Sequence, residues 1–125
     1  MRLHHVALGA RDVARVAAFY REVFALAEVA RHLDDEGALR SIWLELGGAL
    51  LMVERTREPG REVEGVGSGP FLLAFAIRPE ERVALEARLA AAGAPVESRT
   101  GYTSYARDPE GNRVAVSHYP EPASP

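Results

Sequence analysis

Two spacings of hydrophobic residues divide the first part of the chain. The stretch Leu3–Leu8, LHHVAL, has the composition of a strand. From Val13 to Phe24 the apolar residues instead recur every three or four positions, which predicts a helix whose buried face consists of Val13, Val16, Ala17, Tyr20, Val23 and Phe24. Asp12 directly precedes this helix and is the expected N-cap, because its carboxylate can accept a hydrogen bond from a backbone N–H of the first turn.

A hairpin is predicted after a short strand at Glu28–His32 and a polar turn. The segments SIWLEL and ALLMVE flank Gly47–Gly48, a dipeptide that suits a two-residue turn with positive φ. Cross-strand partners share a face, so this turn directs one aliphatic set toward the helix: Ile42, Leu44, Leu51 and Val53. The opposite set mixes polar, aromatic and flexible side chains and is expected to line a ligand-binding surface: Ser41, Trp43, Glu45, Leu50, Met52 and Glu54.

The second half of the chain repeats this order of elements. A strand is expected at Phe71–Ile77, and Pro79 opens a helix that ends before Gly93, a residue suited to a left-handed C-terminal cap. A short strand at Pro95–Ser98 and a second hairpin complete the repeat. The strands of that hairpin are expected at 102–107 and 113–118, joined by the turn sequence DPEGN.

The predicted fold class is therefore α+β, with two tandem βαβββ modules at residues 1–54 and 70–119 that form a single domain over residues 1–119. Residues 55–69 between them are charged and glycine-rich, and we expect a connector or a flap there. The tail at residues 120–125, PEPASP, is expected to be disordered.

Composition excludes several classes of function. The 125 residues, 47% of them hydrophobic, suffice for one globular domain with a real core. Cysteine is absent, which excludes disulfides, thiolate metal sites and cysteine nucleophiles, and which suits the cytoplasm, the expected location. A formal net charge of −3 offers no basic field for nucleic acid, and no apolar run is long enough to cross a membrane. We therefore expect neither nucleic acid nor a membrane as a partner.

The motifs HHVAL, FYREVFAL, the Gly-Gly hairpin, a second helix ending at Gly93 and DPEGNRVAV occur in an order that resembles the vicinal oxygen chelate superfamily. That superfamily groups glyoxalase I, bleomycin-resistance proteins and extradiol dioxygenases, and the resemblance runs from Leu3 to about Tyr119. It implies curved mixed sheets that enclose a cavity, helices on the outside, and a homodimer. One departure is Ala25, where the family pattern has glycine, so the end of the first helix is expected to close differently.

The resemblance also tests for a metal site. A histidine on the first strand points into the cavity in metal-dependent members, and His5 aligns with it, whereas His4 has the opposite parity and is expected beside the helix. The remaining ligand positions hold Met52, Leu72 and Ala115, none of which is a suitable ligand for a divalent ion. We therefore favour no metal cofactor, and a divalent ion held by His5 with Glu54 stays the alternative. His32 and His118 are expected at the surface or the rim.

Other residues favour a pocket for an organic ligand. Arg113 and Ser117 share the face of Ala115, and with Trp43, Met52 and Leu72 they suit an apolar or aromatic molecule that carries an anionic or carbonyl group. Tyr102 and Tyr105 have opposite parity, so only one of them can line the cavity. The function predicted is small-molecule binding without a catalytic metal. The alternative is a lyase, isomerase or dioxygenase that uses His5 with a metal, or His5 or Glu54 as a base without one.

Overall fold

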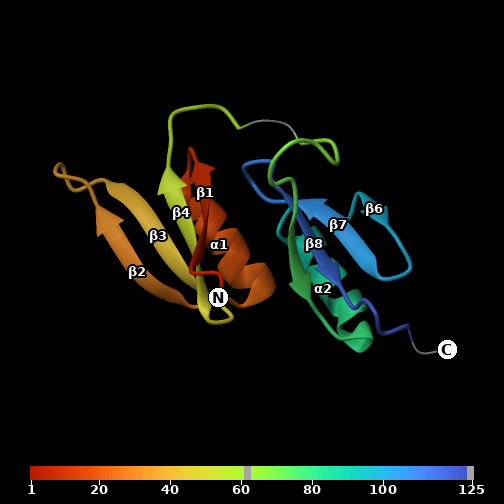
Figure 1. Ribbon diagram of the computed structural model, residues 1–125. Helices are drawn as coiled ribbons and strands as arrows, with labels where there is room; N and C mark the ends of the chain where they lie inside the picture. The colour runs from red at the N-terminus through yellow and green to blue at the C-terminus, as the bar shows by residue number, and fades with distance from the viewer. Residues whose placement is uncertain (61–62, 124–125) are drawn as a thin grey trace. The chain divides into compact units, whose positions relative to one another are not determined.

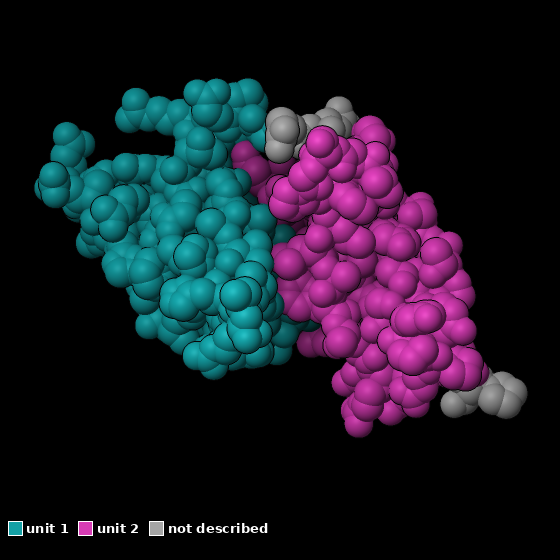
Figure 2. All heavy atoms as spheres, viewed as in Figure 1, with its two compact units in different colours: residues 1–60 teal, residues 61–125 magenta. Residues whose placement is uncertain are grey.

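The protein is described here by a computed structural model that covers residues 1–60 and 63–123. The chain divides into two compact units, residues 1–60 and residues 61–125 (Figure 2). Both repeat one order of elements, a strand, a helix and three further strands, which is the predicted α+β class. None of the helices in the described ranges has the length and apolar character that a membrane span requires.

Unit 1 contains a four-stranded sheet and one helix (Figure 1). Its elements are β1 (His5–Ala10), α1 (Val13–Phe24), β2 (Glu28–Leu33), β3 (Leu39–Leu46) and β4 (Ala49–Arg55). The strand order is β1-β4-β3-β2, with β1 parallel to β4 and the other pairs antiparallel. The predicted hairpin register is confirmed, since Ser41 pairs with Glu54 and Trp43 pairs with Met52. The first strand lies two residues further along the chain than predicted.

The helix α1 covers the aliphatic face of this sheet, as the spacing of its apolar residues predicts. Asp12 caps it by accepting a hydrogen bond from the backbone N–H of Arg15 at 3.1 Å. Phe19 joins the buried positions of the helix, while Phe24, predicted for that face, is only half-buried. The four aliphatic residues that the hairpin directs toward the helix are each at most 1% exposed: Ile42, Leu44, Leu51 and Val53.

The end of α1 departs from the sequence expectation. Ala25 takes the left-handed conformation with φ 56°, the geometry in which a glycine usually ends a helix. The helix therefore closes in the ordinary way, and the expectation of a different closure is wrong. A Cβ in this region costs about 1–2 kcal/mol, which the buried helix face offsets.

Unit 2 repeats the arrangement with shorter strands. Its elements are β5 (Leu73–Ala76), a 3-10 turn η1 (Pro79–Glu81), α2 (Arg82–Ala91), β6 (Ser98–Arg99), β7 (Thr103–Arg107) and β8 (Arg113–Ser117), in the sheet order β5-β8-β7-β6. Gly93 has φ 78° and follows the helix as predicted. Two predicted strands are too long or misplaced: β5 is confined to four residues, and β6 begins only at Ser98, where pairing with Tyr105 of β7 starts.

Charged and polar groups fill part of the layer between α2 and its sheet. Arg82 donates from Nε to the hydroxyl of Ser104 at 2.9 Å and contacts Nε2 of His118 at 3.2 Å. Its guanidinium also reaches the carbonyl oxygens of Thr100, Gly101 and Thr103. His118 is 2% exposed, so the expectation that it lies at the surface is wrong: its parity turns it to the helix side, where Arg82 receives it.

Part of the tail contacts His118. The backbone N–H of Glu121 donates to the carbonyl oxygen of His118 at 2.8 Å, and the imidazole Nδ1 contacts the carbonyl oxygen of Glu121. The tail residue Glu121 is therefore in contact with a buried imidazole, and the expected disorder of the tail stays a prediction. The expectation for residues 124–125 lies outside the described residues.

Candidate functional site

The sheet of unit 1 has one face that no helix of the unit covers, and we call it the acidic face because its two charged residues are Glu45 and Glu54. Register places eleven residues on it: His5, Ala7, Gly9, Ala30, His32, Ser41, Trp43, Glu45, Leu50, Met52 and Glu54. None of these described positions holds an arginine or a lysine. Most of these side chains are half-buried or exposed, as expected of a surface available to a ligand.

Trp43 is held in one orientation on the acidic face. Its indole Nε1 donates to Oε1 of Glu54 at 3.2 Å. Glu54 lies two residues beyond Met52, the cross-strand partner of Trp43. On the other side the ring of His32 approaches it with centroids 4.5 Å apart. His32 and Glu54 both pair with Ser41, which is 1% exposed, so the two partners of the indole belong to one row of the sheet. The hydrogen bond and the ring contact together restrict the orientation of the indole.

His32 is half-buried on the edge strand β2, a position that agrees with the expected surface or rim. A register shift in β2 between His32 and Leu33, and another nearer its start, decide which side chains of that strand face Trp43. The imidazole Nε2 is buried and has no hydrogen-bond partner among the described residues. Sequence reasoning missed this neighbour of Trp43, because bulges in an edge strand break the simple alternation of faces.

The two histidines at the start of the chain contact each other. Nδ1 of His4 lies 2.8 Å from Nδ1 of His5, and both side chains are exposed. His4 precedes β1, so it is not held to the alternation of a strand, and its expected place beside the helix is wrong. His5 falls on the acidic face, as the parity argument predicts, opposite Leu50.

The donors of the acidic face do not fit a divalent ion. His5 pairs with Leu50 and Gly9 pairs with Glu54, so the backbone positions of His5 and Glu54 differ by four residues along the strands, roughly 13 Å at about 3.3 Å per residue. A metal ion needs its ligand atoms within about 2–2.6 Å. No group of three or more His, Cys, Asp or Glu residues in the described ranges is placed to hold a metal ion. No chemical step through a metal is therefore derived for this chain.

The uncovered face of unit 2 carries the opposite charge, and we call it the basic face. Its residues, by register, are Ala74, Ala76, Ser98, Thr103, Tyr105, Arg107, Arg113, Ala115 and Ser117. Arg113, Ala115 and Ser117 thus share the face that the sequence predicts for them. Leu72 directly precedes β5 and is half-buried.

On the basic face, Arg113 is a cation without an ion-pair partner among the described residues. Its guanidinium carbon lies 5.1 Å from the centre of the Tyr105 ring, whose cross-strand partner is Ala115. Arg113 makes no hydrogen bond or ion pair with any described residue, and its Nε is buried without a partner. Its cross-strand partner Arg107 already forms an ion pair, because its Nε donates to both carboxylate oxygens of Glu97 at 3.1 and 3.2 Å.

The hydroxyl groups of Ser117 and Thr103 lie two rows from Arg113 on the same face. Thr103 Oγ1 donates to Ser117 Oγ at 2.8 Å, which leaves the Ser117 hydroxyl proton available. Of the two tyrosines, Tyr105 lies on this face, while Tyr102 packs against the rings of His118 and Tyr119. The choice between them is settled by the register of β7.

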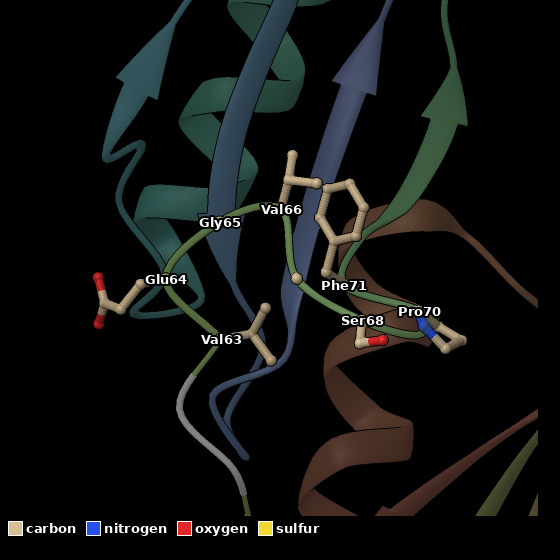
Figure 3. Close-up of a pocket in the computed structure, with 8 residues that line it drawn as sticks. Val63, Glu64, Gly65, Val66, Ser68, Pro70 and Phe71 are labelled. Carbon is tan, nitrogen blue, oxygen red and sulfur yellow. The ribbon is translucent and has the colours of Figure 1, made fainter.

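The connector forms a hollow of its own, about 310 Å³ in volume, within residues 63–71 (Figure 3). Its walls are Val63, Glu64, Gly65, Val66, Gly67, Ser68, Pro70 and Phe71. Figure 3 shows the side chain of Glu64 turned away from the Val66 and Phe71 side chains. Val66 is 86% exposed, so the hollow is open to solvent and presents few polar side chains to a ligand.

Comparison with known proteins identifies the family. Residues 5–117 match a family described as a glyoxalase-like domain. The chain belongs to this glyoxalase-like family. This membership confirms the predicted vicinal oxygen chelate superfamily. No match is found among curated proteins.

Solved structures of the glyoxalase-like fold cover almost the whole chain. The fosfomycin resistance protein FosX of Listeria monocytogenes, complexed with Mn(II) and 1S,2S-dihydroxypropylphosphonic acid, is 20% identical with a TM-score of 0.77, over 93% of this chain and 90% of that one. A glyoxalase/dioxygenase of Nostoc punctiforme is 21% identical with a TM-score of 0.76, over 96% and 92%. Lactoylglutathione lyase of Agrobacterium tumefaciens is 25% identical with a TM-score of 0.67, over 94% and 93%.

Proposed function

We propose that the protein binds a small apolar or aromatic molecule that carries an anionic or carbonyl group, and that it does so without a catalytic metal. The observation that carries this proposal is Arg113, a cation on the basic face with no acidic partner among the described residues. Guanidinium groups bind carboxylates, phosphonates and carbonyl oxygens through charge-assisted hydrogen bonds, and a partly desolvated one gains most from such a ligand.

Neighbouring residues support an organic ligand rather than an ion alone. Ala74 and Ala76 are small, exposed residues of the same face, and Tyr105 offers a ring and a hydroxyl. The available proton of Ser117 adds a second donor for an oxygen atom of the ligand. The sheet of unit 1 separately offers Trp43, an aromatic side chain whose contacts with Glu54 and His32 reduce the conformational entropy lost on binding.

The metal-free part of the proposal rests on the donor set. The four family positions hold His5, Met52, Leu72 and Ala115, and the register leaves Glu54 far along the strands from His5. A single imidazole holds a divalent ion weakly. The neighbour FosX was solved with Mn(II), so the difference lies in the residues that this chain presents and not in the fold.

A calorimetric titration tests the proposal with a matched pair of probes. We expect 2-naphthoate to bind to chelator-treated protein, and its neutral analogue 2-naphthamide to bind more weakly. Arg113→Met, which keeps the apolar stem, should weaken naphthoate binding about tenfold, equal to about 1.4 kcal/mol. Arg107→Met is the control on the same face, and it should change the affinity less because Glu97 already neutralises that arginine. Equal binding of naphthoate to the wild type and to Arg113→Met would overturn the proposal.

The homodimer implied by the superfamily stays a prediction. Light scattering coupled to size-exclusion chromatography measures it, and a mass near twice the 13.6 kDa of one chain is the expected result.

A further inference from the structure

The acidic face holds an aromatic ring and a carboxylate in contact, and this pair has the chemistry of a site for an organic cation. We propose that Trp43 and Glu54 bind the protonated or quaternary amine of a small organic molecule. The inference goes beyond the proposed function, because it assigns a separate site to the sheet of unit 1. The first step is geometric: the indole of Trp43 donates to Glu54, approaches the ring of His32 and is only half-buried, so part of the ring is accessible beside the Glu54 carboxylate.

The second step is the state of Glu54. Its Oε1 accepts the indole N–H of Trp43 at 3.2 Å, while Oε2 has no partner among the described residues. The half-buried carboxylate therefore has one oxygen directed by the indole and one oxygen free. A cation over the accessible part of the indole would interact with its π-electrons and with this oxygen together.

The third step is the charge of the surroundings. The only ionised side chains that register places on the acidic face are Glu45 and Glu54, and no arginine among the described residues of that face competes for them. Glu45 is occupied differently, since its Oε1 accepts the backbone N–H of Gly48 at 2.7 Å and so caps the hairpin turn. Glu54 is therefore the carboxylate that a ligand meets at Trp43.

The acidic face and the basic face attract ligand groups of opposite charge. Arg113 would repel an ammonium group and attract an anion, whereas Glu54 does the reverse.

The chain offers a direct optical test, because Trp43 is its one tryptophan. Choline is titrated at constant ionic strength while the fluorescence of Trp43 is recorded, and the neutral alcohol in which carbon replaces the ammonium nitrogen is the matched probe. We expect a saturable change with choline and at least tenfold weaker binding of the alcohol. Equal binding of the two probes, or no saturable change with choline, overturns the inference.

Two conservative variants locate the effect. Glu54→Gln keeps an acceptor for the indole N–H but removes the charge, and it should weaken choline binding at least tenfold while the fluorescence of free Trp43 stays close to that of the wild type. Glu45→Gln should leave the choline affinity within twofold. If both variants lose affinity equally, the general charge of the face attracts choline and the assignment to Glu54 is wrong.

Failure of this inference and failure of the proposed function give different results. Arg113→Met should leave choline binding within twofold, because it changes neither the Trp43 ring nor the Glu54 carboxylate of the amine site. Loss of choline binding with intact naphthoate binding would refute only the amine site. Loss of naphthoate binding with intact choline binding would refute the anion site and leave Trp43 and Glu54 as a cation site.

Discussion

The two units share one topology and differ on both faces of their sheets. In unit 1 the layer between helix and sheet is apolar, and the uncovered face is acidic around Trp43. In unit 2 the corresponding layer contains Arg82, Ser104 and His118, and the uncovered face is basic around Arg113. The same fold thus supports a core made by hydrophobic burial and a core made partly by hydrogen bonds to a guanidinium. Stability and ligand chemistry can therefore vary independently in the two repeats.

The largest expected effect is on the guanidinium core of unit 2. Arg82→Met should lower the free energy of unfolding by about 3 kcal/mol, because Ser104 and His118 stay buried and lose a donor, and three carbonyl oxygens lose theirs. Urea unfolding followed by circular dichroism measures the change. Arg88→Met, at an exposed position of the same helix, is the control and should cost less than about 0.5 kcal/mol. Equal losses in the two variants would mean that the network contributes little.

The second effect is that the free energy of unfolding decreases at acid pH. It comes from Glu86 on α2 of unit 2, whereas the helix–sheet layer of unit 1 is apolar. Hydrogen bonding from Arg99, together with Ser104 and the charge of Arg82, lowers the pKa of Glu86 to about 2 from 4.5. A group with a depressed folded-state pKa stabilises the fold fully above its unfolded pKa, so this contribution is complete above pH 4.5 and disappears as the pH falls toward 2. Screening at a partly exposed site reduces it to roughly 2 kcal/mol.

Urea unfolding between pH 2 and pH 7 checks this pH dependence. Glu86→Gln should be less stable than the wild type at neutral pH, and the difference should shrink as the pH falls through the interval from 4.5 to 2. A difference that is constant over this interval would show that Glu86 has an ordinary pKa in the folded chain.

A smaller effect concerns the end of α1 in unit 1. Ala25→Gly relieves the left-handed strain at φ 56° and should stabilise the protein by up to about 1 kcal/mol, after the greater freedom of glycine in the unfolded chain is subtracted. Thermal unfolding measures it. The contrasting position is Gly93 in unit 2, which already has φ 78°, and Gly93→Ala should destabilise. A destabilising Ala25→Gly would show that the alanine methyl group packs well enough to outweigh the strain.

The smallest expected effect separates binding from stability. Arg113→Met removes a side chain with no ion pair in the described part of the chain, so the free energy of unfolding should change by less than about 0.5 kcal/mol while anion binding falls. Urea titration of the same samples used for calorimetry provides the comparison. A large loss of stability would indicate that Arg113 is structural and that weakened binding is secondary.

Sequence reasoning predicted most of the fold and part of the site, for identifiable reasons. The Gly47–Gly48 turn fixes the register of the first hairpin, so Trp43, Met52 and Glu54 fall on one face as predicted. Bulges in β2 and the place of His4 outside β1 defeat simple alternation, and His32 was missed for that reason. The burial of His118 depends on Arg82, which lies 36 residues away in the chain. The local sequence around His118 does not predict such a partner.

The claim on which the rest depends is that this member of the glyoxalase-like family presents too few metal ligands to hold a divalent ion. Elemental analysis of protein purified without chelator and equilibrated with Zn, Ni, Mn and Fe(II) tests it most directly. We predict far less than one ion per chain and no difference between wild type and His5→Ala. One tightly bound ion per chain, lost in His5→Ala, would contradict the account and favour a metal-dependent enzyme.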